Sequence, residues 1–221
     1  MSHGHFAIAI DGPAASGKST IARELSNRLG LIMVNSGAMY RVVTWKIMKD
    51  GIDPEDPRAV VDALNRMQLE CGVDGLSSTI TVDGFDPGEE LRSQMVNDHV
   101  SQVSAVPEVR RLLVDLQRGY LNHSNIVMEG RDIGSAVFPD TPFKIYVDAD
   151  PEVRAERRLA AGEVDSVVER DRKDSQRKTD PLKVADGAKV LENSGHTIDS
   201  AVDAAIEILR AQGLALPQME S

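Results

Sequence analysis

A stretch near the start of the chain has the residue types and the spacing of a phosphate-binding loop. It runs Gly12-Pro13-Ala14-Ala15-Ser16-Gly17-Lys18-Ser19, with Thr20 following, and it fits the pattern G-x-x-x-x-G-K-[ST]. In such a loop the backbone N–H groups converge on an anion, the lysine follows the transferred phosphoryl group, and the final hydroxyl can ligate magnesium. The sequence therefore predicts that Lys18 and Ser19 serve phosphoryl transfer.

The segments on either side of this loop are those that a phosphate-binding loop requires. Residues 6–10 form a short apolar run, which is typical of a buried strand, and residues 20–29 have the apolar spacing of a helix that ends at Gly30. A helix that starts at the loop presents its positive end to the bound anion. The alternative is a Gly/Ser turn that happens to hold a lysine, and it does not require this order of elements.

A second group of polar residues follows the apolar run 126–128, which we predict to be a strand. It reads Glu129-Gly130-Arg131-Asp132. Open α/β sheets bind ligands just beyond the carboxyl ends of their strands. We therefore expect Glu129 to be the acidic partner of a metal ion, directly or through water, with an ordinary surface turn as the alternative.

Arginines outside the loop could hold a second phosphate, because the planar guanidinium group binds phosphate oxygens in pairs. Five are predicted at strand ends, at helix starts or in a charged segment: Arg41, Arg110, Arg131, Arg170 and Arg177. In the helix predicted for 107–121, Val109, Leu112, Leu113 and Leu116 form the expected buried stripe, and Arg110 lies off it, facing solvent or a cleft.

The remaining pattern alternates strands and helices, which predicts an α/β fold with a five-stranded parallel sheet flanked by helices. Further strands are expected at 31–34, 143–147 and 188–191, with helices at 38–49, from 151 onward and at 200–212. Residues 67–73 and 79–85 flank an Asp-Gly turn and predict a small antiparallel hairpin. We expect a core of residues 1–51, 107–161 and 181–221, a monophosphate-binding insertion at 52–106, and a short lid at 162–180.

Composition excludes several other classes of protein. The chain has 221 residues and a formal net charge of −10, which argues against a nucleic-acid partner. Its single cysteine excludes an internal disulfide and suits a reducing compartment. No apolar run approaches the roughly eighteen residues of a membrane span, and residues 1–5 do not resemble a signal peptide. We expect a cytoplasmic monomer with small-molecule substrates and no membrane partner.

Several blocks of sequence, in this order and spacing, resemble bacterial cytidylate kinases of the nucleoside monophosphate kinase family. They are residues 10–20 around the loop, Asn35-Ser36-Gly37-Ala38-Met39-Tyr40-Arg41, residues 101–110, residues 129–134, residues 137–140, and Glu169-Arg170-Asp171 with Asp174 and Arg177. The match spans nearly the whole chain. The loop alone is shared by many enzymes, whereas the blocks at 36–41 and 129–132 are far more specific.

This resemblance implies transfer of a phosphoryl group from ATP to CMP or dCMP, with magnesium, and it implies a role for each matching residue. Residues Gly12 to Thr20 would hold the ATP phosphates. The acceptor phosphate would be held by Arg41, Arg131 and Arg177. The cytosine edge would be read by Ser101, Arg110 and Asp132, with Ser36 nearby. The ribose would be contacted by Arg170 and Asp174. The transferring group would be covered by Arg157 and Arg158.

Two features depart from the family pattern, and other functions compete with it. Asn35 stands where the family usually has aspartate, and only residues 159–168 separate the paired arginines from Glu169, so the lid is short. The nearest alternative is another P-loop kinase that acts on UMP, AMP or a metabolite hydroxyl. A nucleotide-dependent ATPase or switch, with 52–106 as a partner-docking element, is more distant. A GTPase is disfavoured because the sequence has no N-K-x-D motif.

Overall fold

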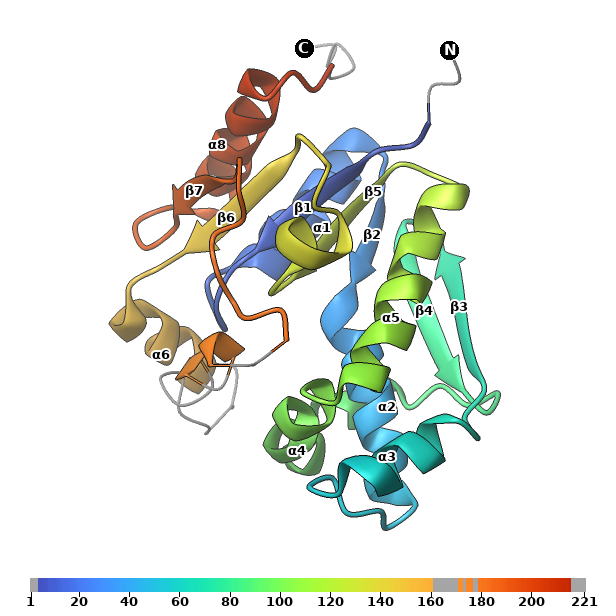
Figure 1. Ribbon diagram of the computed structural model, residues 1–221. Helices are drawn as coiled ribbons and strands as arrows, with labels where there is room; N and C mark the ends of the chain where they lie inside the picture. The colour runs from blue at the N-terminus through green and yellow to red at the C-terminus, as the bar shows by residue number, and fades with distance from the viewer. Residues whose placement is uncertain (1–3, 161–170, 173, 177–178, 216–221) are drawn as a thin grey trace.

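The computed structural model describes residues 4–160, 171–172, 174–176 and 179–215, and within them the chain forms an α/β fold around one sheet (Figure 1). The sheet has seven strands in the order β3-β4-β2-β5-β1-β6-β7. Their bounds are β1 Ala7–Asp11, β2 Ile32–Asn35, β3 Leu69–Asp74, β4 Ser77–Val82, β5 Ile126–Gly130, β6 Lys144–Asp148 and β7 Lys189–Glu192.

The predicted number of strands is wrong, because the hairpin joins the main sheet. The strands β2, β5, β1, β6 and β7 are parallel, as predicted. The hairpin of β3 and β4 also forms where expected, but β4 pairs with β2 through Met33 and Ser77, and the Met33 nitrogen donates to the Leu76 carbonyl at 2.7 Å. The turn of the hairpin therefore docks on β2 and extends a five-stranded sheet to seven.

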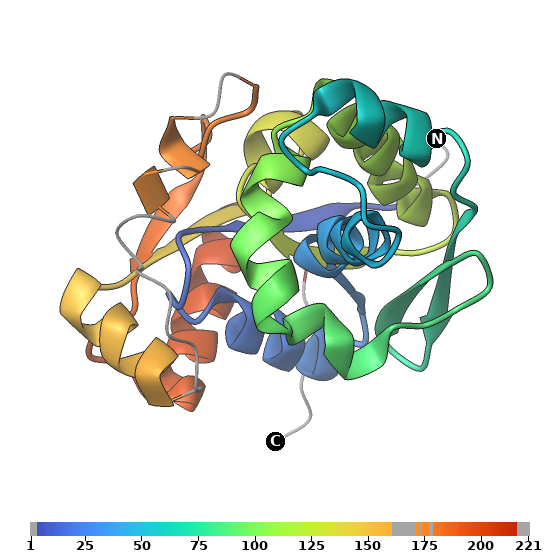
Figure 2. The ribbon, with the colours of Figure 1, turned by 90° about the horizontal axis from the view of Figure 1, so that it is seen from below.

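Helices cover both faces of the sheet (Figures 1 and 2). Their bounds are α1 Lys18–Leu29, α2 Ser36–Lys49, α3 Pro57–Leu64, α4 Gln94–Ser104, α5 Pro107–Gly119, α6 Pro151–Ala160 and α8 Ile198–Ala211. Short helical turns span Gly88–Arg92, Tyr120–Asn122 and Ile133–Val137. One apolar core lies under α1 and α8, and the other lies under α2, α3, α4 and α5.

The strand before the phosphate-binding loop, β1, is an interior strand between β5 and β6, and it packs on both cores. In β1 the side chains of Ala7 and Ala9 pack in the core under α2, whereas Ile8 and Ile10 pack in the core under α1 and α8. A strand that is buried on both faces reads as a continuous apolar run, which is why this segment is easy to recognise in the sequence. It holds the loop in the middle of the molecule.

The predicted buried stripe of α5 is partly wrong. Leu112 is 37% exposed, whereas Arg110 is 2% exposed. The helix packs through Val109, Leu113 and Gln117, which are spaced four residues apart, so its buried face is rotated away from Leu112. Arg110 can be buried on this face because carboxylates pair with its charge, as described below.

The inserted region 52–106 packs closely against the core. Trp45 of α2 stacks on Phe85, with ring centroids 5.3 Å apart, and its Nε1 donates to Glu90 Oε2 at 2.7 Å. The division into core, insertion and lid stays a prediction, and much of the lid lies outside the described residues. In the part of the chain that the structure describes, none of the helices is long and apolar enough to cross a membrane.

Candidate active site

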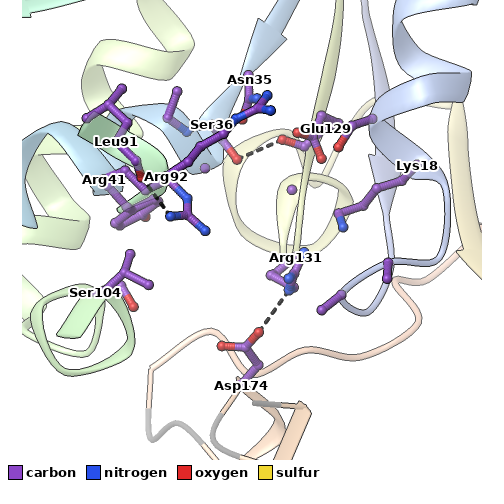
Figure 3. Close-up of a pocket in the computed structure, with 18 of the residues that line it drawn as sticks. Lys18, Asn35, Ser36, Arg41, Leu91, Arg92, Ser104, Glu129, Arg131 and Asp174 are labelled. Atoms are coloured by element: carbon purple, nitrogen blue, oxygen red, sulfur yellow. Dashed lines mark hydrogen bonds and ion pairs between the residues drawn. The ribbon is translucent and has the colours of Figure 1, made fainter. Parts of the chain in front are cut away.

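A cleft of about 840 Å³ lies at the carboxyl ends of β1, β2 and β5 (Figure 3). Most residues that the sequence singled out line it: Ala14, Ala15, Gly17, Lys18, Ser19, Thr20, Ser36, Arg41, Ser101, Glu129, Arg131, Asp132, Arg157, Arg158 and Asp174. Gly12, Pro13, Ser16 and Arg110 lie outside this lining. Arg170 and Arg177 fall outside the described residues, so their predicted roles stay predictions.

The phosphate-binding loop is closely packed from behind, which explains its glycines. Gly17 has φ 96°, and a Cβ atom there would lie 2.3 Å from Asn193 Nδ2. Asn193 in turn donates from Nδ2 to the Ser16 carbonyl at 2.7 Å. Only glycine can adopt this backbone conformation where there is no room for a Cβ atom. The residue after β7 therefore fixes the shape of the loop.

The lysine of the loop is buried at the start of α1. Lys18 is 6% exposed, and its Nζ donates to the Pro13 carbonyl at 3.0 Å. It lines the cleft and lies on the same side of it as the loop backbone (Figure 3). A charged ammonium group held at a helix N-terminus is the arrangement that binds a polyphosphate.

The paired arginines of α6 lie close to the loop. Arg157 donates from Nη1 to the Ser16 carbonyl at 3.2 Å and from Nη2 to the Asn193 carbonyl at 2.8 Å. The side chain predicted to cover the transferring group thus supports the loop backbone in this structure. Arg158 is 6% exposed and lines the cleft beside it.

A further ion pair beside the loop was not predicted. Arg154 pairs with Asp171, and Asp171 Oδ1 accepts a hydrogen bond from the Ala14 nitrogen at 3.3 Å. The charged segment after α6 therefore contacts the loop directly.

The first arginine of the predicted acceptor clamp is positioned by the inserted region. Arg41 donates from Nη1 to the Leu91 carbonyl and to Asn97 Oδ1, both at 2.8 Å. Asn97 also donates from Nδ2 to the Arg92 carbonyl at 3.0 Å. Arg92 lines the cleft next to Arg41, and the sequence analysis missed it (Figure 3).

The start of α2 is tied to the end of β5. Ser36 donates from Oγ to the Glu129 carbonyl at 2.7 Å, and a Cβ atom on Gly130 would lie 2.5 Å from that Oγ. Asn35 caps α2, because its Oδ1 accepts from the Ala38 nitrogen at 3.1 Å. The asparagine that replaces the usual aspartate thus keeps the capping function without the charge.

The predicted base-reading pair forms one buried group of charges. Arg110 pairs through Nη2 with Asp132 Oδ2 and through Nε with Asp180 Oδ2 at 3.0 Å, and it lies over the Tyr40 ring, 5.6 Å from its centroid. Burial alone would lower the pKa of Arg110, but Asp132, Tyr40 and Asp180 outweigh it, and the pKa is raised. Asp132 faces the cleft, and Arg110 stands behind it. Arg110 Nη1 is buried and has no hydrogen-bond partner among the described residues.

A second ion pair crosses the cleft between β5 and the charged segment. Arg131 donates from Nε to Asp174 Oδ2 at 2.8 Å. Burial lowers the pKa of Arg131, and the Asp174 carboxylate more than offsets this, so the pKa is raised and the guanidinium stays charged. Asp174, which we predicted to contact ribose, holds the predicted phosphate-binding arginine in this structure.

One buried carboxylate that the sequence analysis passed over connects the two sides of the site. Asp11 is the last residue of β1, and its two oxygens accept from the backbone nitrogens of Ile133 and Gly134, both at 2.7 Å. Burial raises the pKa of Asp11 to about 7, against these two hydrogen bonds, which lower it. The loop that carries Arg131 and Asp132 is thereby fixed to the strand that carries the phosphate-binding loop.

The oxygens that face the cleft suit magnesium. Ser19 and Glu129 both line it, and Glu129 is 4% exposed. The described residues contain no group of three or more His, Cys, Asp or Glu side chains placed to hold a metal. Magnesium in phosphoryl-transfer enzymes takes one or two protein oxygens and completes its shell with phosphates and water. A hydroxyl and one carboxylate therefore fit this ion.

Solved structures that resemble this one share its fold. The structure superimposes on TT1252 from Thermus thermophilus with a TM-score of 0.51, at 20% identity, covering 96% of this chain and 100% of the other. It matches a gluconokinase from Sinorhizobium meliloti 1021 with a TM-score of 0.50, at 11% identity, covering 93% and 92% of the two chains. At these identities the likeness establishes the α/β fold alone.

Sequence comparison is more specific. The family model for cytidylate kinase matches residues 8–211. The chain is 42% identical to the cytidylate kinase of Corynebacterium efficiens, over 96% of this chain and 97% of that one. It is 40% identical to the cytidylate kinase of Streptomyces avermitilis, over 94% of both chains, and 39% identical to that of Clostridium botulinum strain Langeland, over 93% and 98%. The protein therefore belongs to the cytidylate kinase family.

Proposed function

We propose that the protein transfers the γ-phosphoryl group of ATP to CMP or dCMP, giving ADP and CDP or dCDP. One observation carries the proposal: a single cleft joins a phosphate-binding loop on one side to Arg41, Arg131 and Asp132 on the other. A donor triphosphate and an acceptor monophosphate can thus meet within it. The named relatives are cytidylate kinases, which fits this arrangement.

On the donor side, the loop backbone and Lys18 bind the phosphates of ATP. The loop leads directly into the N-terminus of α1, whose positive end favours an anion, and the buried ammonium group of Lys18 adds a positive charge. Ser19 and Glu129 would hold magnesium, which when bound neutralises charge on the phosphates. Asn193 and Arg157 keep the loop in shape from behind.

On the acceptor side, Arg41 and Arg131 bind the phosphate of CMP. Both guanidinium groups are held by neighbours, Arg41 by Asn97 and Arg131 by Asp174, so the clamp is largely ordered before the substrate arrives. No general base is needed, because the acceptor phosphate is already ionised at neutral pH. Catalysis then depends on alignment and on charge neutralisation by Lys18, Arg131, Arg157 and Arg158.

The base is read by Asp132, which Arg110 supports from behind. The Asp132 carboxylate accepts a hydrogen bond from the exocyclic amine of cytosine, which uracil lacks. Against uracil the same carboxylate would face a carbonyl oxygen, and setting two acceptors against each other in place of a hydrogen bond costs several kcal/mol. Ser101, which lines the cleft, supplies a further polar contact to the ring edge. Arg170 and Arg177 keep the ribose and phosphate roles that the resemblance implies.

The test of this function is a panel of acceptors in a coupled assay for ADP. We expect CMP and dCMP to be turned over far faster than UMP, AMP or GMP, with little ATP hydrolysis when no acceptor is present. Faster turnover of UMP or AMP than of CMP would refute the proposal. Hydrolysis that CMP does not stimulate would favour an ATPase or switch. We also propose that the protein is a cytoplasmic monomer; sedimentation of the purified chain tests its oligomeric state, and fractionation of cells tests its location.

A further inference from the structure

We propose that Asp180 sets the base specificity of this enzyme by sharing Arg110 with Asp132. The inference rests on the proposed function, in which Asp132 accepts a hydrogen bond from the cytosine amine. Asp180 lies outside the cleft lining and reaches the base-reading pair through its ion pair with Arg110. It is therefore a positioning residue that acts through Arg110.

The contacts of the guanidinium group show how the sharing works. Arg110 reaches Asp180 through Nε, at 3.0 Å from Oδ2, and reaches Asp132 through Nη2. These two nitrogens form one edge of the guanidinium plane, the edge that binds both oxygens of a single carboxylate when it pairs in bidentate fashion. With Nε committed to Asp180, this edge is divided between two carboxylates.

The three charged side chains differ in exposure, and only Asp132 lines the cleft. The side chain of Asp180 is 33% exposed, that of Arg110 is 2% exposed, and that of Asp132 is 6% exposed and lines the cleft. One positive charge is thus shared by two negative ones, so Asp180 draws part of the attraction of Arg110 away from Asp132. Within a buried site such electrostatic effects are stronger than in water. A carboxylate that is less fully neutralised is a better acceptor for an amine.

The backbone at Asp180 is held in an unusual conformation. Its φ is +48°, in the left-handed region that residues with a side chain rarely adopt. Such a conformation persists where the surrounding contacts determine it. The Asp180 side chain contacts one deeply buried group in this way, the guanidinium of Arg110. Aspartate is among the few residues with a side chain that adopt this region, so the backbone conformation is compatible with the ion pair to Arg110.

Removing Asp180 releases one edge of Arg110. In Asp180→Ala, Nε is expected to turn to Asp132 and to form a bidentate pair with it. The Asp132 carboxylate is then more fully neutralised and more of its lone pairs are engaged, so it accepts more weakly from the cytosine amine. CMP binding and the preference for CMP over UMP should both fall, while the binding of ATP is unaffected.

The experiment compares steady-state kinetics of the wild type with three variants of the full chain. Asp180→Ala removes the contact, Asp180→Asn keeps an oxygen for Nε without the charge, and Asp186→Ala is the matched control, because Asp186 is an exposed aspartate in the same connecting segment. For Asp180→Ala we expect KM for CMP to rise about three- to tenfold, the size of one lost hydrogen bond. The ratio of kcat/KM for CMP to that for UMP should fall by a similar factor.

In the same comparison, KM for ATP should stay within about twofold of the wild type, Asp180→Asn should recover part of the loss, and Asp186→Ala should behave as the wild type. Thermal unfolding of each variant confirms that it is folded. A folded Asp180→Ala with unchanged CMP kinetics, or with equal rises in KM for CMP and ATP, overturns the inference. If the wild type itself does not prefer CMP, the proposed function fails. If it does and Asp180→Ala matches it, only the role of Asp180 fails.

Discussion

Asp11 Oδ2 accepts a hydrogen bond from the backbone nitrogen of Gly134 at 2.7 Å, across 123 residues of sequence. The other oxygen of the same carboxylate accepts from Ile133. Asp11 directly precedes the phosphate-binding loop, and Ile133 directly follows Asp132. A single buried carboxylate thus ties the phosphate-binding loop to the loop that carries Arg131 and Asp132, the proposed donor and acceptor parts of the site.

The first prediction concerns the pH dependence of activity. The pKa of Asp11 is raised to about 7 by burial, with the nearby Asp132 charge raising it further and Lys18 lowering it. A protonated carboxyl accepts poorly at its hydroxyl oxygen, so one of the two hydrogen bonds weakens as the pH falls through 7. We expect kcat/KM for CMP to fall on the acid side with an apparent pKa near 7, as measured in a pH profile.

Asp11→Asn separates this effect from the titration of CMP itself. The asparagine amide is neutral at all pH values. Its NH2 group faces one of the two backbone N–H groups and cannot accept from it, so the variant resembles the protonated form of Asp11. The variant should have lowered kcat/KM for CMP at pH 8, and its profile should retain only the titration of the CMP phosphate near pH 6. A profile identical to that of the wild type would show that Asp11 does not position the acceptor loop.

The same raised pKa predicts how stability depends on pH. Because the folded-state pKa of Asp11, about 7, is above its ordinary value of 3.8, folding favours the protonated form. The stability that this group contributes is therefore complete below about pH 3.8 and is lost as the pH rises through 7. Between pH 5 and pH 8 the wild type should lose about 2 to 3 kcal/mol of unfolding free energy relative to Asp11→Asn. Urea denaturation at the two pH values measures this difference.

Substitution of the loop lysine should affect the chemical step. Lys18→Ala removes the charge that follows the transferring group, and we expect turnover to fall by two to three orders of magnitude, about 3–4 kcal/mol of transition-state stabilisation. Lys189→Ala, at an exposed lysine of β7, is the control and should have wild-type kinetics. Single-turnover measurements distinguish slower chemistry from weaker ATP binding. A loss of tenfold or less would contradict the role given to Lys18.

Loss of the base-reading carboxylate should affect selectivity first. Asp132→Ala removes the acceptor for the cytosine amine and also leaves Arg110 with Asp180 as its remaining carboxylate partner among the described residues. We expect the preference for CMP over UMP to decline by at least tenfold while KM for ATP changes little. Competition assays with both acceptors measure the preference. If CMP and UMP are still discriminated as well as in the wild type, Asp132 is not the base reader.

The packing of the phosphate-binding loop predicts a sharp contrast between two glycines. In Gly17→Ala the new Cβ would lie 2.3 Å from Asn193 Nδ2 at a φ of 96°, so the loop must shift and ATP binding should fall strongly. In Gly119→Ala no heavy atom lies within 4 Å of the new Cβ, and the residue is at the end of α5. This variant should bind ATP normally and unfold at the same or a slightly higher temperature. Calorimetric titration with ATP and thermal melts test both.

Much of this arrangement could be predicted from local sequence. The loop, its flanking strand and helix, and the parallel order of strands follow from apolar runs and from one motif, because a central strand and the helix after it leave clear periodic patterns. The hairpin was also predicted from its Asp-Gly turn. Its docking on β2 through Met33 depends on a contact between distant segments, and no local pattern encodes that.

The residues that the sequence analysis missed share this non-local origin. Asn97, Asn193 and Asp180 act through hydrogen bonds to segments at least 36 residues away. Each is an ordinary polar residue in its own neighbourhood. The burial of Arg110 is similar, since a charged residue on a helix is expected at the surface unless its partners are known. Asp11 alone left a signal, as an acidic residue that ends an otherwise apolar strand.

The stacking of Trp45 on Phe85 gives the protein an optical probe of its own. Trp45 is the single tryptophan of the chain, and its indole donates to Glu90, which lies beside Leu91, the residue whose carbonyl holds Arg41. In the proposed function Arg41 binds the acceptor phosphate, so that binding should change the surroundings of the indole through Leu91 and Glu90. The emission of unlabelled enzyme should therefore respond to the acceptor nucleotide, so that binding can be followed in real time by stopped-flow fluorescence.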